Sequence, residues 1–244
     1  MPDIEILPDA NAVAERAASL LVDALAATSG PVAVSLSGGA TPERLYRRLA
    51  AEPWRNRLPW VRVHWFWSDE RLVAPDHPDS NFGMARRAML DAVPVERSHI
   101  HDVTTRLDPH AAAAAYEAEL RHFYGAAKLE PARPLFEVSL LGMGEDGHTA
   151  SLFAGSAALD ERHHWTAAVT GARGDPRVTL TPPAINSSRL ILMLVTGRTK
   201  RGILKRIAAG EALPAARIRP IGPMRWLADR TAAGPETRGR RRAP

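Results

Sequence analysis

Short apolar segments alternate with helical segments along most of this chain, and that order is typical of the α/β class. The apolar segments are nearly continuous, as expected for strands buried on both faces of a parallel sheet. Because no internal repeat or long linker interrupts the alternation, we predict a single α/β domain over residues 1–233, with a mostly parallel central sheet flanked by helices on both faces. The predicted strands are residues 32–36, 61–67, 135–141, 178–181 and 190–195, and the predicted helices are residues 10–27, 42–50, 81–91, 109–124, 200–209 and 223–233.

Charge and composition exclude several classes of protein. Residues 234–244 hold four arginines and one glutamate, a net +3 out of the chain's +5, and we expect them to form a disordered basic tail rather than a nucleic-acid site. The absence of cysteine excludes disulfides, thiolate nucleophiles and cysteine-based metal centres. No signal-peptide pattern and no run of about 20 apolar residues is present, so we expect a cytoplasmic protein without a membrane partner. We expect a monomer, with a weak dimer as the alternative.

A glycine-rich turn follows the predicted strand at residues 135–141 and carries an aspartate two residues before a histidine. Ligands of open α/β sheets bind where strands end. Asp146 and His148 would supply there a group that titrates near neutral pH and a charge that orients it. The spacing also matches the G-x-G-x-x-G pattern of dinucleotide sites, but Glu145 and Asp146 would lie where the diphosphate binds. Considered alone, the motif leaves an ordinary turn with a surface histidine as the alternative. The glycines that allow close backbone approach to a ligand are Gly142, Gly144 and Gly147.

A second glycine turn, at residues 35–43, leads from a predicted strand into a predicted helix. Thr41 is a favourable N-cap and Pro42 suits the first helical position. The two glycines allow several amides to point into one concavity, and amides together with a helix dipole form an anion site, most naturally for a phosphate. It is not a P-loop, because no lysine follows the glycines; a plain strand-to-helix turn is the alternative. The candidate binding residues are Ser37, Gly38, Gly39, Ala40 and Thr41.

A third polar segment, Asp69-Glu70-Arg71, follows the predicted strand at residues 61–67, with Ser80-Asn81 ten residues further on. An arginine at this edge of the sheet could bind a phosphate through two hydrogen bonds. A surface arginine paired with a neighbouring acid is the alternative. Three polar segments at strand ends of one sheet point together to a binding site for an anionic ligand.

These three segments, in this order, resemble the 6-phosphogluconolactonase family. The family shows a Ser-Gly-Gly-Ser/Ala-Thr-Pro turn, an Asp-Glu-Arg segment followed by Ser-Asn, and a Gly-x-Gly-x-Asp-Gly-His-Thr-Ala-Ser-Leu-Phe segment, which spans residues 142–153 here. Ala40 departs slightly from the pattern, because serine is common there; the change removes a hydroxyl but keeps the amide. Further matches are Arg177-Val178-Thr179-Leu180-Thr181, Thr196-Gly197 with Lys200, and Trp226-Leu227-Ala228-Asp229.

The resemblance implies a fold shared with glucosamine-6-phosphate deaminase and ribose-5-phosphate isomerase. It implies hydrolysis of 6-phospho-D-glucono-1,5-lactone to 6-phosphogluconate, the second step of the oxidative pentose phosphate pathway, without a metal or organic cofactor. On this hypothesis His148 is the general base for the attacking water, and Asp146 orients His148 or contacts sugar hydroxyls. The phosphate would be held by the amides of residues 38–41, by Arg71 and by Lys200. Further expected substrate contacts are Asp69, Asn81 and Gly144, with Arg177 as a weaker candidate.

Two alternatives use the same scaffold. A sugar-phosphate deaminase or isomerase would carry Ile-Ala-Phe-Asn-Glu after the histidine, with a glutamate that supports it, whereas the corresponding position here is Phe153. A non-enzymatic sugar-phosphate sensor would usually carry a separate DNA-binding domain. The first strand-like segment begins within ten residues of Met1, so we do not expect such a domain here.

Other histidines and the tryptophans are assigned to structure rather than chemistry. His99 and His101 have no partner at a spacing typical of metal sites. His163 and His164 are expected to be a solvated pair that precedes a strand. The tryptophans clustered around residues 61–67 are expected to pack in the core rather than to stack on bases; they are Trp54, Trp60, Trp65 and Trp67.

Overall fold

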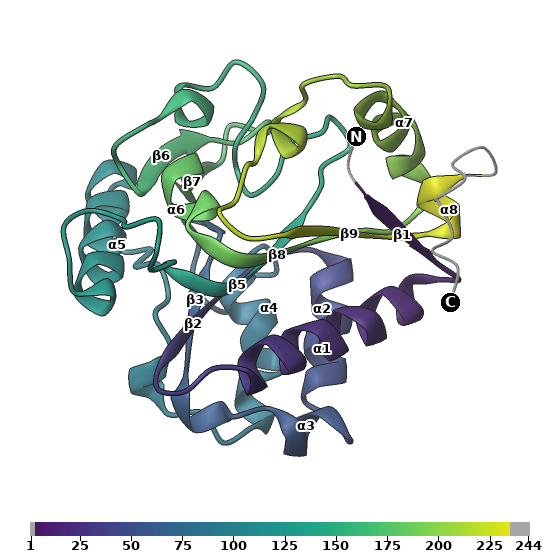
Figure 1. Cartoon of the computed structure of the whole chain (residues 1–244). Coiled ribbons are helices and arrows are strands. Elements are labelled where there is room, and N and C mark those ends of the chain that lie inside the picture. The colour runs from purple at the N-terminus through teal and green to yellow at the C-terminus, as the bar shows by residue number, and fades with distance from the viewer. Residues whose placement is uncertain (1–2, 235–244) are drawn as a thin grey trace.

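The central feature of the fold is a six-stranded sheet in which every neighbouring pair of strands is parallel. The structure, a computed structural model, describes residues 3–234. The predicted basic tail therefore lies, apart from Gly234, outside the described residues. From one edge of the sheet to the other (Figure 1), the strands are β1 (Ile4–Leu7), β9 (Met224–Asp229), β8 (Ser188–Val195), β5 (Phe136–Gly142), β2 (Val32–Leu36) and β3 (Val63–Trp67).

The strand order reverses between β2 and β5. After β2 the chain moves outward to β3, then returns to form β5 on the other side of β2 and continues to β8 and β9. Ligands of open α/β sheets bind at such a reversal, outside the carboxyl ends of the strands. Both glycine-rich turns follow these two strands, so the topology brings them to the same crevice.

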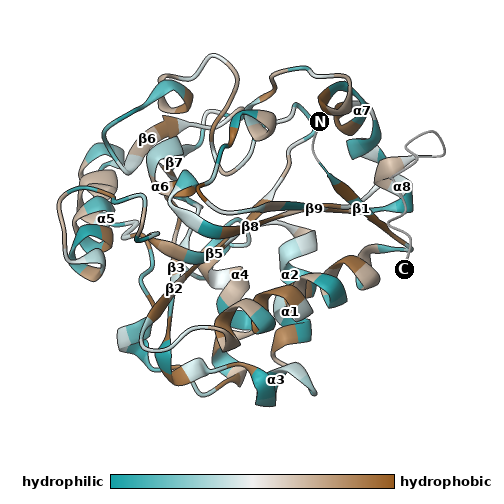
Figure 2. Cartoon of the chain, viewed as in Figure 1, coloured by the Kyte–Doolittle hydropathy of each residue, from teal (hydrophilic) through white to brown (hydrophobic). Residues whose placement is uncertain are grey.

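Each face of the sheet is covered, because side chains of a strand alternate between its two faces. On β8, Leu192 and Leu194 belong to the core shared with the N-terminal helices, whereas Ile191 and Met193 belong to the opposite core. The strands are strongly hydrophobic while the helices carry hydrophilic outer surfaces (Figure 2). One face is covered by α1 (Ala10–Ala26), α2 (Ala40–Leu49), α3 (Trp54–Arg57) and α4 (Asn81–Ala88), and the other by α5 (Pro109–Tyr124), α6 (Pro182–Asn186), α7 (Arg201–Ala208) and α8 (Arg230–Ala233) (Figure 1).

A second, smaller sheet was not predicted. Its antiparallel strands lie in the order β4 (Asp69–Arg71), β7 (Pro176–Leu180) and β6 (Thr166–Thr170). The Asp-Glu-Arg segment is therefore a short strand in its own right rather than the loop that ends β3. It pairs with a segment about a hundred residues away, with Arg71 opposite Arg177, and such a partner cannot be read from local pattern.

The prediction of a helix over residues 223–233 is wrong. Residues 224–229 form β9 in the interior of the main sheet, and only Arg230–Ala233 is helical. Trp226 pairs with Met193 on one side and with Ile4 on the other, and its side chain is buried. Burial between two strands thus overrides a local composition that is compatible with a helix.

The other predicted elements are present with shifted ends. The strand predicted from residue 61 begins at Val63, after a 3₁₀ turn over Trp60–Arg62. All four tryptophans of the cluster are buried, which confirms packing as their role. No helix within residues 3–234 is both long and apolar enough to cross a membrane.

Candidate active site

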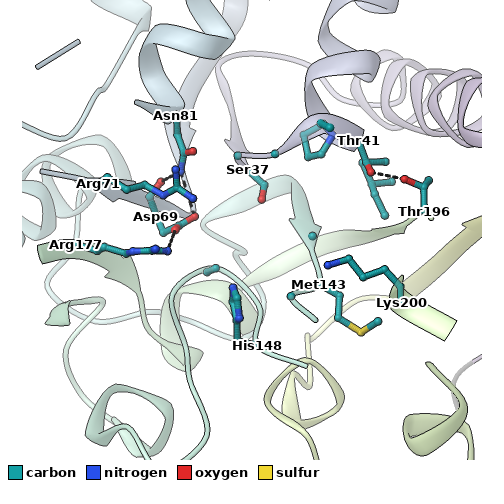
Figure 3. A pocket seen from close by; sticks show the side chains of 18 residues that line it. Ser37, Thr41, Asp69, Arg71, Asn81, Met143, His148, Arg177, Thr196 and Lys200 are labelled. Carbon is teal, nitrogen blue, oxygen red and sulfur yellow. Dashed lines mark hydrogen bonds and ion pairs between the residues drawn. The ribbon is translucent and has the colours of Figure 1, made fainter. Parts of the chain in front are cut away.

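A cavity of about 410 Å³ lies at the carboxyl ends of β2 and β5 (Figure 3). The three polar segments singled out in the sequence meet there. Of the predicted site residues, only Asp146 does not line it. The predicted residues that do are Ser37, Gly38, Gly39, Ala40, Thr41, Asp69, Arg71, Asn81, Gly144, His148, Arg177 and Lys200.

His148 is held by Asp146 and points its ring into the cavity (Figure 3). Asp146 Oδ1 lies 2.6 Å from His148 Nδ1 and accepts a hydrogen bond from the His148 backbone amide at 3.1 Å. Partial burial raises the pKa of Asp146, but the backbone hydrogen bond, the charge and the ring hydrogen bond of His148 outweigh it and hold that pKa below its usual value. With Nδ1 engaged by the carboxylate, Nε2 is the ring nitrogen available to a ligand.

The turn that carries this pair leaves no room for a side chain at position 144 while His148 and Asp146 keep their positions. A Cβ atom there would lie 2.2 Å from His148 Nδ1 and 2.7 Å from Asp146 Oδ1. The Gly144 amide also donates to the His148 carbonyl oxygen at 2.8 Å, which closes the turn. Close packing of the imidazole over bare backbone therefore explains why position 144 is a glycine.

The turn after β2 presents an uncapped helix N-terminus to the same cavity. The prediction that Thr41 is the N-cap is wrong: α2 begins at Ala40, and its N-cap is Gly39, at φ +101°, without a side-chain cap. The Thr41 hydroxyl instead lies 2.6 Å from that of Thr196, at the end of β8. The first amides of α2 are thus not satisfied by a capping side chain, and together with the helix dipole they favour an anion.

Asp69, Arg71 and Asn81 form one wall of the cavity (Figure 3). Arg71 Nη1 donates to the Asp79 carbonyl oxygen at 2.8 Å, while Arg71 Nε is buried without a hydrogen-bond partner among the described residues. The Asn81 carboxamide donates to the Asp69 carbonyl oxygen at 2.8 Å. Arg71 is the cation among these three residues, so its guanidinium is the group of this wall that can attract an anionic ligand.

Arg177 lines the cavity beside this wall but is largely engaged by protein groups. Its Nε donates to Asp175 Oδ2 at 2.6 Å and its Nη1 to Ser151 Oγ at 3.3 Å. Ser151 Oγ in turn donates to Asp69 Oδ2 at 2.7 Å. The buried Ser151 therefore links two cavity residues and does not approach His148 as a nucleophile would.

Lys200 and Thr196 lie across the cavity from Arg71 and Arg177 in the view of Figure 3, with Ser37 between them. Burial lowers the pKa of Lys200, and the charges of Glu145 and Asp146 partly oppose that effect. The cavity thus presents cations from two sides and amides between them, a distribution that suits an elongated anionic ligand.

Several lining residues were not predicted. Thr196 follows a predicted apolar strand, just as the other site segments do, so the same strand-end argument could have found it. Met143, Ala150 and Leu194 carry no polar signal that sequence could reveal. Gly142 was expected to allow close backbone approach to a ligand, and the lining residues that were not predicted are Pro42, Met143, Ala150, Leu194 and Thr196.

No group of three His, Cys, Asp or Glu side chains within residues 3–234 is arranged to hold a metal ion. His101 Nδ1 lies 2.6 Å from Glu119 Oε1, and His101 Nε2 lies 2.8 Å from His64 Nδ1. These histidines bond to one another and to an acid. His163 and His164 are exposed, as expected for a solvated pair.

Comparison with known proteins places the chain in a family. Residues 8–226 match the family described as glucosamine-6-phosphate isomerases/6-phosphogluconolactonase. The chain belongs to this family. A 6-phosphogluconolactonase of Nostoc sp. is 42% identical over 242 residues, which cover 96% of this chain and 97% of that protein.

Solved structures support the same assignment. The 6-phosphogluconolactonase of Trypanosoma cruzi superposes with a TM-score of 0.85 at 30% identity and covers 97% of each chain. A monomeric glucosamine-6-phosphate deaminase superposes with a TM-score of 0.80 at 21% identity, over 96% of this chain and 99% of that one. At that identity the second likeness concerns the fold alone, which confirms the expected architecture.

Proposed function

We propose that this chain hydrolyses 6-phospho-D-glucono-1,5-lactone to 6-phospho-D-gluconate, the second step of the oxidative pentose phosphate pathway. The observation that carries the proposal is the Asp146–His148 pair, 2.6 Å apart, on a cavity that also presents an uncapped helix N-terminus and cations. Relatives with the lactonase name match nearly the whole chain.

A lactone is an activated ester, so the attacking water needs modest help. His148 Nε2 accepts a proton from water as the water oxygen bonds to C1, and Asp146 stabilises the imidazolium that forms. When the bond between C1 and the ring oxygen breaks, Nε2 returns the proton to that oxygen, which becomes the C5 hydroxyl. Such proton transfer is typically worth about 10²–10⁴-fold in rate.

The phosphate lies at the end of the substrate far from C1. Its binding would hold C1 next to His148. The first amides of α2 can donate hydrogen bonds to the phosphate without giving up a capping side chain, and Arg71 and Lys200 add positive charge from two sides. Asp69 and Asn81 offer an acceptor and an amide to the sugar hydroxyls.

The deaminase alternative would need a carboxylate next to the histidine. The Phe153 ring centroid lies 4.7 Å from that of His148, so an apolar ring occupies the neighbourhood where deaminases carry the glutamate. A phenyl ring cannot orient or charge the imidazole, which favours hydrolysis over amine chemistry.

The test is an assay on freshly generated 6-phosphogluconolactone, by pH-stat or by coupling to product oxidation. The rate without enzyme is subtracted, because the lactone also hydrolyses spontaneously. We expect a clear enzyme-dependent rate with the lactone and none for ammonia release from glucosamine 6-phosphate. The reverse pattern would replace the lactonase assignment by the deaminase.

A further inference from the structure

Glu70 lies between two cavity residues but turns away from the cavity. Successive side chains of a strand point to opposite faces, so Asp69 and Arg71 of β4 line the cavity while Glu70 enters the protein behind it. Its side chain is buried, with 1% of the residue exposed. The mechanism above uses both neighbours and leaves this carboxylate without a role.

The Glu70 carboxylate accepts four hydrogen bonds from the segments that it joins. Oε1 accepts from the backbone amides of Arg71 and Asn81, each at 2.8 Å. Oε2 accepts from the Phe82 amide at 2.6 Å and from the Ser80 hydroxyl at 3.3 Å. The carboxylate thus ties β4 to the first turn of α4, and it holds by their backbones two residues that line the cavity.

Only the ionised carboxylate accepts from all four donors at once. A proton on Oε1 would displace a backbone amide, and a proton on Oε2 would either displace the Phe82 amide or require the Ser80 hydroxyl to turn and accept it. Burial raises the pKa of Glu70 to about 7, although the amides of Phe82, Asn81 and Arg71 oppose that effect. Both protonation states are therefore accessible near neutral pH.

Few other charges act on Glu70. Asp69 further raises its pKa. From α5, the buried Tyr116 hydroxyl interacts with it and stays neutral, because burial raises the pKa of Tyr116 far above its usual value. The first turn of α4 contributes neutral groups, and β7 places the apolar Val178 opposite Glu70.

We propose that Glu70 is a positioning residue for substrate binding: its ionised carboxylate holds Arg71 and Asn81 in place, and its protonation loosens both and weakens the binding of the phosphorylated ligand. The choice of ligand rests on the proposed function. The affinity for 6-phosphogluconate should therefore fall as the pH drops below neutrality, and this loss should depend on Glu70.

The test compares the Kd of 6-phosphogluconate, by calorimetry, at pH 6 and pH 8 for the wild type and Glu70→Gln. Glutamine keeps the shape but directs an amide N–H₂ at donors, as the protonated acid would. At pH 8 we expect Glu70→Gln to bind about fivefold to tenfold more weakly, as for loss of a hydrogen bond, and at pH 6 the two proteins should converge. Ionisation of the ligand's own phosphate affects both proteins alike and cancels in the ratio.

Glu137→Gln is the matched control. Glu137 is also buried but lies at the opposite end of the sheet, on β5, where it pairs with Arg189 at 3.0 Å. Its variant should follow the wild type at both pH values. A ratio of Kd values for Glu70→Gln and wild type that is the same at pH 6 and pH 8 would overturn the proposal, because a purely structural defect would not depend on this ionisation.

If Glu70→Gln fails to fold, a pH titration of the wild type followed by NMR tests the proposal instead. The backbone amide resonances of Asn81 and Phe82 should then titrate with a midpoint near pH 7 in the unliganded protein, and their failure to shift would overturn the proposal. If the wild type bound 6-phosphogluconate without hydrolysing the lactone, the proposed function would fail while the Glu70 comparison would stand. Inorganic phosphate serves as the probe if 6-phosphogluconate does not bind.

Discussion

The Asn81 carboxamide lies directly against the backbone of Gly38. A Cβ atom at position 38 would lie 1.9 Å from Asn81 Oδ1. The glycine turn after β2 and the first turn of α4 are therefore packed so closely that neither can change without the other. This contact joins the predicted phosphate site to the wall that carries Asp69 and Arg71.

Gly38→Ala should displace Asn81 and weaken substrate binding. The added methyl would push the carboxamide away from the Asp69 carbonyl oxygen and disturb the amides of the turn, so we expect KM to rise by roughly tenfold, as for loss of one to two hydrogen bonds. Steady-state kinetics measures the effect. Gly202→Ala, at an open position in α7, is the control and should keep KM unchanged; an unchanged KM in both variants would contradict the packing argument.

His148→Ala should lose about 10²–10⁴-fold in kcat, the usual contribution of a general acid–base, because no other group is proposed to take the proton from water. Product affinity, measured by calorimetry, should change little. His163→Ala, at an exposed histidine, is the control. Activity within twofold of wild type would remove His148 from the catalytic role.

Arg71→Ala and Lys200→Ala should raise KM more than they lower kcat. Hydrogen bonds to charged groups are worth about 1.5–3 kcal/mol, which corresponds to roughly 10–100-fold in affinity. The measurement is KM for the lactone together with the inhibition constant of inorganic phosphate. Arg87→Ala removes an arginine of α4 that does not line the cavity and controls for net charge. Wild-type constants in both test variants would refute the phosphate assignment.

The protein should lose stability as the pH falls from about 6.5 to about 4, in part through His64. Burial, together with the charges of His99 and His101, lowers the pKa of His64 to about 4. The unfolded chain therefore binds a proton on His64 at a higher pH than the folded chain, so acid favours unfolding. Urea midpoints across this range should fall less steeply for His64→Asn than for the wild type, and parallel curves would show that His64 does not contribute.

Activity should survive exhaustive treatment with EDTA, because the proposed mechanism assigns proton transfer to His148 and needs no Lewis acid. The assay is the lactone hydrolysis above, before and after chelation, with a buffer-exchanged sample as control. Loss of activity that a divalent metal restores would refute the mechanism.

Much of this architecture could be predicted from local pattern. The continuous apolar runs at residues 32–36, 135–141 and 190–195 are central strands, and the glycine turns that follow two of them do face one cavity. Prediction failed where a segment's partner is distant in sequence. The residues of β9 resemble a helix locally, and β4 is too short to show a period; both become strands because of what they pair with.

The features of the site also fall into those that local sequence predicts and those that depend on distant contacts. The sequence alone determined which residue types follow the strands of the parallel sheet, and hence that Asp146, His148 and a glycine turn suited to an anion would lie at its carboxyl edge, because consecutive parallel strands all end on the same side. Only the tertiary structure decided that Thr41 bonds to Thr196 rather than capping α2, that Arg177 is engaged by Asp175 and Ser151, and that Glu70 turns inward. These outcomes depend on contacts between segments far apart in the chain, whose geometry is set by packing and not by local propensity.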